Sequence, residues 1–179
     1  MAIKTFILEY FSEKEKRHNA IEKSLKEFLK NDNIQVLYTQ KGKPYIIGTE
    51  TEKFISVTTT GKIMLCVYSD KPVGIDGEHL LRFGSDNKTD YIALSERFFS
   101  EEEADFVREG DGDPMRFVRV WVRKEAYVKL TGKGLADFLN FSVTDGVKFF
   151  SKVDGVPIKK FSINFPGSNE YLFAIAGAE

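Results

Sequence analysis

The sequence of 179 residues predicts an α+β fold, because both halves of the chain contain strand-like and helix-like segments. Short apolar runs bounded by Gly, Asn or Pro indicate the strands, and apolar residues repeated every three to four positions indicate the helices. The strand-like runs are joined by short turns, which favours antiparallel pairing. No clear internal repeat is present, so the pattern alone leaves open whether the halves form two similar lobes.

The first half is predicted to hold one helix among several strands. Ser12 and Glu15 have the spacing of a capping box, which predicts a helix running to about Leu29. Its apolar stripe consists of Ile21, Leu25, Phe28 and Leu29. The expected strands are Ile3 to Tyr10, Ile34 to Thr39, Phe54 to Thr60, Lys62 to Ser69 and Val73 to Glu78. A hairpin turn is expected at Gly61, and its second arm is almost continuously apolar, so that arm should be central in its sheet.

The second half is predicted to begin with helices, after a polar stretch from Arg82 to Thr89 that is a candidate hinge. Ser100 and Glu103 form another capping box, which predicts a short acidic helix ending near Arg108. A second, longer helix should follow. Its expected cap is Asp113, with Pro114 in the first position and an end near Gly132. The strands expected after it are Phe141 to Val143, Val147 to Val153, Ile158 to Asn164 and Tyr171 to Ala176.

Composition excludes several classes of function. The net charge is −1 and the pI about 6.2, so no overall basic field recruits nucleic acid. The single Cys66 allows no internal disulfide and no cysteine-based zinc site, and we expect a buried, inert thiol. No stretch reaches the ~20 apolar residues of a membrane span, and Glu9 interrupts the run where a signal peptide needs continuity. We therefore expect a cytoplasmic protein without a membrane or nucleic-acid partner.

The chemistry is expected to depend on carboxylates and lysines, because the chain has only two histidines. That count does not fit a Ser-His-Asp hydrolase or a multi-histidine metal site. Asp76 and Glu78 close a predicted strand, where their side chains point the same way with Cα atoms roughly 6.6 Å apart. Two such carboxylates repel unless a cation lies between them, and oxygen-only ligands suit magnesium. The alternative is a strand end with two hydrated acids.

The predicted long helix carries charges on two faces. Glu125 and Lys129 fall on its apolar stripe, where a charged pair is costly unless it is paired, hydrated or bound to a ligand. They form either a structural ion pair or part of a ligand site. On the opposite side, Arg116, Arg119 and Arg123 form either a solvated face or a patch for an acidic partner.

These separate signals together resemble the signature of a known family. Val73-Gly74-Ile75-Asp76-x-Glu78 is followed by Trp121-x-x-Lys124-Glu125-Ala126-x-x-Lys129. This pair of motifs resembles that of 4′-phosphopantetheinyl transferases, and specifically of the larger, surfactin-synthetase-activating type. Supporting matches are Gly42-Lys43-Pro44, the segment Ser56 to Gly61, Arg97-Phe98-Phe99-Ser100 and Gly132-Lys133-Gly134-Leu135.

The resemblance implies two similar lobes, residues 1–84 and 85–179, each an antiparallel sheet with packed helices, and a ligand cleft between them. It implies magnesium-dependent transfer of the 4′-phosphopantetheine group from coenzyme A to a serine of an apo acyl or peptidyl carrier protein, with release of 3′,5′-ADP. The carrier would serve fatty-acid, polyketide or nonribosomal-peptide synthesis, and a monomer would suffice. The alternatives are a non-catalytic relative that binds coenzyme A or carrier domains, and a magnesium-dependent pyrophosphate hydrolase.

The resemblance also assigns roles to residues of this chain. Asp76, Glu78 and Glu125 would hold the magnesium ion, and Glu125 would also take the proton of the carrier serine. Lys124 and Lys129 would contact the phosphates of coenzyme A, and Lys129 would act with Glu125 in catalysis.

Two further residues, Lys43 and Arg17, would approach the adenosine end of coenzyme A. Two departures from the family pattern stand out. Where the family carries a Ser-His pair, this chain has Thr58-Thr59, so Thr59 replaces a phosphate-contacting imidazole with an uncharged donor. Gly77 replaces a bulky apolar residue between the two strand carboxylates, which is expected to loosen that strand end.

Overall fold

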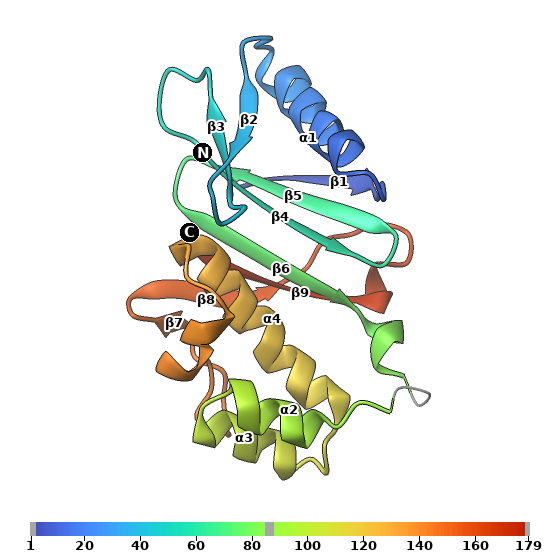
Figure 1. Ribbon diagram of the computed structural model, residues 1–179, viewed down its shortest axis with the longest axis vertical. Helices are drawn as coiled ribbons and strands as arrows, with labels where there is room; N and C mark the ends of the chain where they lie inside the picture. Colours follow the sequence, from blue (N-terminus) through green and yellow to red (C-terminus); the bar gives the residue numbers. More distant parts are fainter. Residues whose placement is uncertain (1–2, 85–87, 178–179) are drawn as a thin grey trace.

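The computed structural model describes residues 3–84 and 88–177, and it confirms the predicted α+β fold (Figure 1). The strands form a three-stranded sheet, a two-stranded hairpin and a four-stranded sheet, and every pairing is antiparallel. Within the described ranges, no helix is both long and apolar enough to cross a membrane.

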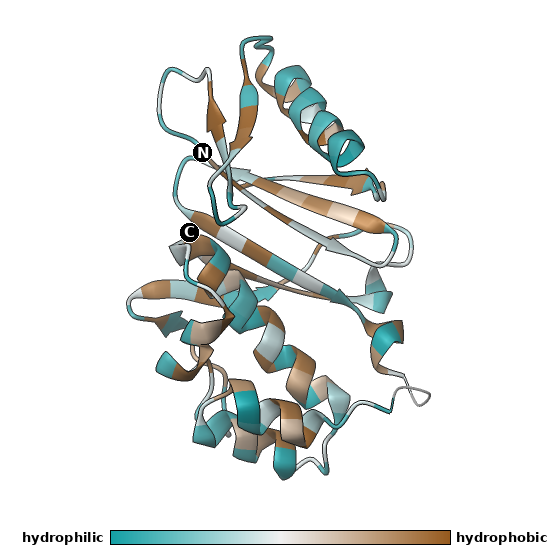
Figure 2. Ribbon diagram, viewed as in Figure 1, coloured by the Kyte–Doolittle hydropathy of each residue, from teal (hydrophilic) through white to brown (hydrophobic). Residues whose placement is uncertain are grey.

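The first sheet has the order β1-β5-β4 and is covered by one helix. Its strands are β1 (Lys4–Glu9), β4 (Phe54–Thr60) and β5 (Ile63–Ser69), and the helix is α1 (Lys14–Leu29). As predicted, β5 is the central strand, and Cys66 within it is buried. Ile21 and Leu25 of α1 pack in one core cluster with Cys66 and Tyr68. Figure 2 shows the hydrophobic colour along β5 and mostly hydrophilic residues along α1.

A separate hairpin stands beside this sheet, made of β2 (Gln35–Tyr38) and β3 (Pro44–Ile47). The strand β3 was not expected from the sequence. The turn before it contains Gly42 at φ +82, and the amide of Gly42 donates to the Thr39 carbonyl.

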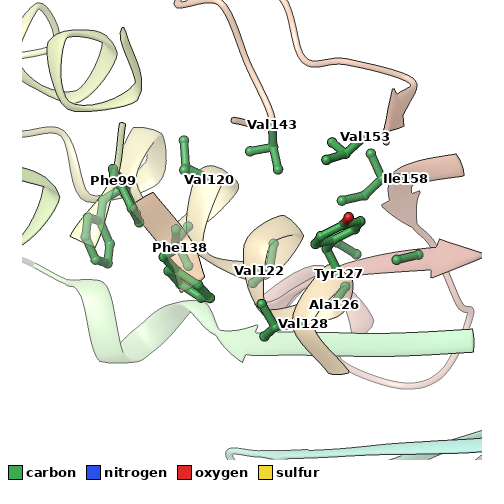
Figure 3. Packing of buried hydrophobic residues seen from close by; sticks show 14 of the residues in the cluster. Phe99, Val120, Val122, Ala126, Tyr127, Val128, Phe138, Val143, Val153 and Ile158 are labelled. Carbon is green, nitrogen blue, oxygen red and sulfur yellow. The ribbon is translucent and has the colours of Figure 1, made fainter. Parts of the chain in front are cut away.

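The second sheet has the order β6-β9-β8-β7 and carries the long helix of the molecule. Its strands are β6 (Val73–His79), β7 (Lys152–Val153), β8 (Val156–Phe161) and β9 (Tyr171–Gly177). The helices are α2 (Tyr91–Phe98), α3 (Glu101–Arg108) and α4 (Pro114–Thr131), with 3₁₀ turns at Leu80–Phe83, Leu135–Asn140 and Ser168–Glu170. The largest core cluster is built around α4 (Figure 3).

A row of hydroxyl groups on β4 joins the two sheets. Because side chains alternate along a strand, Ser56, Thr58 and Thr60 all face β6. The Ser56 hydroxyl accepts from the Ile75 amide at 3.0 Å, and the Thr60 hydroxyl accepts from the His79 amide at 2.7 Å. We call this row the hydroxyl seam. It replaces a backbone ladder between β4 and β6, which belong to different sheets.

Several predicted details of local structure were correct. The Ser100 and Glu103 capping box is present at the start of α3. Asp113 accepts from the Met115 amide at 2.8 Å at the start of α4, with Pro114 as the first helical residue. The helix ends at Gly132, whose φ of +74 is the left-handed conformation that favours glycine.

Other details were wrong. Ser12 does not cap α1, which begins at Lys14 with Glu13 at the N-cap position. The guanidinium of Arg17 donates to the carbonyls of Phe11 and Ser12, both at 2.7 Å. A side chain from within α1 therefore holds the backbone of the two residues that come just before the helix.

The region between α4 and β7 also differs from the prediction of two strands. Residues 141–151 contain only an isolated bridge between Thr144 and Phe149. The carboxylate of Asp145 accepts from the amides of Val147 and Lys148, so a side chain holds the turn there. The candidate hinge from Arg82 to Thr89 includes residues 85–87, which lie outside the described residues.

Candidate functional site

The helix α4 lies directly on β6, and Gly74 makes this close approach possible. A Cβ atom at Gly74 would lie 2.0 Å from the carbonyl oxygen of Ala126 and 2.6 Å from the amide nitrogen of Leu130. Both neighbours are backbone atoms of α4, so any larger residue would push the helix away from the strand. The contact places the side chains of Glu125 and Lys129 on the side of α4 that meets the β6 carboxylates.

Asp76 is the point where three elements meet. Its side chain is buried, with 6% of the residue exposed. Oδ1 accepts a bond of 2.7 Å from Lys129 Nζ on α4 and one of 3.1 Å from the Thr58 hydroxyl on β4. The candidate site residues Asp76 and Lys129 are therefore in direct contact, and Thr58 is a partner that sequence reasoning missed. The sequence pattern that could have indicated Thr58 is the hydroxyl residue at every second position of β4, at Ser56, Thr58 and Thr60.

Glu78 and Glu125 extend this cluster of carboxylates. Burial raises the pKa of Glu125 to about 7, with further contributions from the negative charges of Asp76 and Glu78. Burial also raises the pKa of Glu78, while Arg82, whose Nη1 donates to Glu78 Oε2 at 2.7 Å, acts in the opposite direction. The structure thus places the three predicted metal ligands within electrostatic range of one another.

The chemistry of this donor set fits magnesium, since three carboxylates offer oxygen ligands only. The side chains of the described ranges include no group of three or more His, Cys, Asp or Glu already gathered tightly enough to hold a metal. Lys129 binds Asp76 and Arg82 binds Glu78, so a magnesium ion would have to replace these cations as the counter-charge.

A cleft of about 330 Å³ lies beside Glu125, where β3, β4 and the end of α4 come together. Four lysines line it: Lys41, Lys43, Lys129 and Lys133. Glu125 is the one acidic residue among the described residues of its lining. Lys43 Nζ donates to the carbonyl of Leu130 at 2.6 Å, and burial lowers the pKa of Lys43. The cleft is therefore basic and suited to an anionic ligand.

A smaller pocket of about 210 Å³ adjoins this cleft and shares Gly42, Pro44 and Val57 with it. Arg17 and Thr59 both line the smaller pocket, so the structure brings together two of the residues expected near coenzyme A. Thr59 is exposed and does not face Asp76, in contrast to its neighbour Thr58. An elongated ligand could occupy both spaces at once.

Lys124 is the predicted site residue that the structure does not bring to the cleft. It is fully buried at 0% exposure, and its ammonium lies 2.6 Å from Glu103 Oε2 and 2.5 Å from the Phe141 carbonyl. These bonds connect α4 to α3 and to Phe141, which directly follows the 3₁₀ turn Leu135–Asn140. In this arrangement Lys124 is paired with Glu103 in the core and does not line the cleft, and its phosphate contact stays a prediction.

Gly77 does not leave the strand end loose, contrary to expectation. A Cβ atom there would lie 2.1 Å from Cδ1 of Phe173, so the aromatic ring already fills the space of a larger side chain. The Phe173 ring stacks on Tyr171 with a centroid distance of 5.8 Å. The bulk between Asp76 and Glu78 is thus supplied by the paired strand β9.

Comparison with known proteins gives consistent matches. A sequence model of the 4′-phosphopantetheinyl transferase superfamily matches residues 72–176. A Bacillus subtilis protein named 4′-phosphopantetheinyl transferase is 31% identical over 143 residues, covering 76% of this chain and 60% of that protein. A putative 4′-phosphopantetheinyl transferase of Synechocystis sp. is 28% identical over 116 residues, covering 63% and 45%. A third relative, from Aneurinibacillus migulanus, is 27% identical, and the match covers 59% and 41%. The chain spans about half the length of these relatives.

Proposed function

The chain belongs to the 4′-phosphopantetheinyl transferase superfamily, and from this membership and the geometry of the cleft we propose that it is a magnesium-dependent transferase. Its donor substrate would be coenzyme A, and its acceptor a serine of an apo acyl or peptidyl carrier protein. The products would be the holo carrier protein and 3′,5′-ADP.

The observation that carries this proposal is the ion pair between Asp76 and Lys129 beside a cleft that Lys129 lines together with Glu125 and three further lysines. Coenzyme A is a polyanion, and the lysines Lys41, Lys43 and Lys133 offer the charges that its phosphates require. The adjoining pocket with Arg17 and Thr59 offers space for the adenosine end.

The proposed reaction is a displacement at the β-phosphorus of coenzyme A. The serine oxygen forms a new bond to that phosphorus, and the bond from phosphorus to the bridging oxygen breaks, so 3′,5′-ADP leaves with the electron pair. Glu125 accepts the serine proton, because its carboxylate is the acid that lines the cleft among the described residues. Lys129 can stabilise the charge that develops on the leaving phosphate.

Asp76, Glu78 and Glu125 are the residues that would hold magnesium in this site. A bound magnesium ion would neutralise phosphate oxygens and lower the cost of bringing the anionic groups together. Thr58 would keep the Asp76 carboxylate oriented through its hydrogen bond. Gly74 would keep α4 close enough for Glu125 to share the site with the strand carboxylates.

The test is incubation of the protein with coenzyme A, magnesium and an apo carrier protein, followed by intact mass spectrometry of the carrier. We expect the mass gain of one phosphopantetheine group. Glu125→Gln should lower the transfer rate at least ~10²-fold, the range for a lost general base. The matched control is Glu96→Gln, whose carboxylate binds Arg108 away from the cleft and should leave the rate unchanged.

Two outcomes would contradict the proposal. Tight binding of coenzyme A without any mass gain on a panel of apo carriers would indicate a non-catalytic relative. Release of 3′,5′-ADP in the absence of carrier, at the same rate as in its presence, would indicate a pyrophosphate hydrolase.

A further inference from the structure

A second groove, of about 580 Å³, lies on the side of α4 that carries Arg119 and Arg123. At 100° per residue, this side is opposite the one that carries Glu125. The groove is completed by the end of β8, the segment after it and the start of β9. It shares no lining residue with the lysine cleft, so it is a separate feature of the molecule.

Arg123 lines this groove and is buried, with 8% of the residue exposed. Its Nη1 donates to the carbonyl of Arg119 at 2.8 Å, and its guanidinium stacks on the Phe149 ring with 3.9 Å from Cζ to the centroid. The Nε atom is buried and has no hydrogen-bond partner among the described residues. Burial, with the nearby charge of Arg119, lowers the pKa of Arg123 to about 10.

The charge of Arg123 is not balanced by any acid in the part of the chain that the structure describes. None of the described residues lining the groove is Asp or Glu, whereas Arg119 and Lys160 add two further positive charges. No ion pair of the described residues involves Arg119, Arg123 or Lys160. A buried guanidinium without a counter-ion is costly, so an anion held beside Arg123 by Arg119 and Lys160 would lower that cost.

The walls of the groove restrict what that anion can be. Met115, Phe149 and Phe161 supply apolar surface, and Ser162 and Ser168 supply hydroxyl groups. The volume is in the range of small-molecule sites. A phosphate monoester offers three acceptor oxygens and close to two negative charges, which matches three cations better than one carboxylate does. We propose that this groove is a second ligand site that binds a phosphate monoester carrying an apolar or aromatic group.

The Nε–H group of Arg123 provides a direct test by protein-observed NMR. The probe is phenyl phosphate, titrated into the full chain, with inorganic phosphate as the comparison ligand. We expect the Arg123 Nε–H resonance to shift when the phosphate anion lies beside the guanidinium. Phenyl phosphate should bind about tenfold tighter than inorganic phosphate, because its ring buries apolar surface.

Variants connect the binding to the groove. Arg123→Gln should weaken phenyl phosphate about ten- to a hundredfold, as for a lost charge-assisted bond. Arg116→Gln is the matched control, because Arg116 lies on the same helix as Arg123, stacks on a phenylalanine ring and donates to a carbonyl, that of Phe106 on α3, but lies outside the groove. Arg119→Gln and Lys160→Gln alter exposed side chains without disturbing the core, and each should weaken binding about two- to fivefold.

Three results would overturn the proposal. The first is no shift of the Arg123 resonance at millimolar phenyl phosphate. The second is binding that shifts the resonances of Lys43 and Lys129 and has the same affinity in the three groove variants, which would place the probe in the lysine cleft. The third is an acidic peptide that shifts the Arg123 resonance while phenyl phosphate does not, which would make the groove a protein-docking surface.

Discussion

At Asp76, one carboxylate oxygen serves two donors, and both come from other elements of the fold. The sequence indicated Asp76, Glu78, Glu125 and Lys129 because charged residues stood in apolar or strand-end patterns. It could not show that Lys124 is bound to Glu103, since a helix pattern does not say which neighbouring helix supplies a counter-charge. It also could not separate Thr58 from Thr59, because only the observed register decides which of two adjacent residues faces Asp76.

The first prediction at this scale concerns the pH dependence of stability. The pKa of Glu125 is raised from 4.5 to about 7, so the folded protein holds this proton more tightly than the unfolded chain. Stability should therefore fall as pH rises through the window between these values. Glu125→Gln lacks this titration, so without metal its Tm should rise relative to the wild-type Tm between about pH 5 and about pH 8. A Tm difference that is constant with pH would contradict the assignment.

A second prediction uses the opposite orientations of two adjacent threonines. Thr59→His should place an imidazole in the pocket with Arg17 and tighten coenzyme A about tenfold or more, through a charge-assisted bond. The gain should be smaller for dephospho-coenzyme A and should shrink above the imidazole pKa. Thr58→His is the contrasting variant: it would force a larger side chain into the buried contact with Asp76 and lower the Tm. Calorimetric titration and thermal melts measure both effects, and equal behaviour of the two variants would refute the observed register.

At the scale of elements, signals that are local in sequence predicted local structure well. The caps of α3 and α4 follow from side chains within three residues of the helix start, so their prediction needed no tertiary information. The segment after α4 was predicted as strands, but several of its backbone amides donate to side-chain carboxylates and not to a neighbouring strand. One example is the Val143 amide, which donates to the carboxylate of Glu103 at 2.6 Å. Such a bond joins residues 40 positions apart and leaves no trace in an apolar pattern.

The contact between α4 and β6 gives a prediction for Gly74. Gly74→Ala would place a methyl group against the backbone of α4, so we expect the free energy of unfolding to fall by about 1–3 kcal/mol or more. Gly134→Ala is the matched control, because no atom lies within 4 Å of its Cβ position and its φ of −128 is compatible with alanine. Denaturant unfolding compares the two. Equal stabilities would mean that the helix does not need this close approach.

On the scale of the whole molecule, the lysine cleft connects elements that are far apart in sequence. Lys43 from the loop before β3 binds the carbonyl of Leu130 near the end of α4, across 87 positions. Lys129 binds Asp76 and lies 3.4 Å from the carbonyl of Val57 on β4. The fold class was predictable because it depends on many averaged patterns. The residues of the lysine cleft could not be predicted from local patterns, because such patterns do not encode contacts between segments that are far apart in sequence.

A ligand that spans these elements should stabilise the entire fold. Coenzyme A at a hundredfold excess over its Kd should add about 2.7 kcal/mol to the free energy of unfolding, by mass action. Lys43→Gln should reduce the stabilisation at the same ligand concentration, since it removes a cation from the cleft. Thermal shift measurements with and without coenzyme A test this. An unchanged Tm in the presence of saturating coenzyme A would contradict binding in the cleft.

The hydroxyl seam also determines how the molecule would carry mechanical load. The first described strand, β1, belongs to one sheet and the last, β9, belongs to the other. A tensile force applied at these two strands must cross from β4 to β6, where side-chain hydroxyls and the apolar cluster around Leu65 and Ile75 replace a backbone ladder. Under tension the seam should therefore part first, while the backbone ladders within each sheet stay intact.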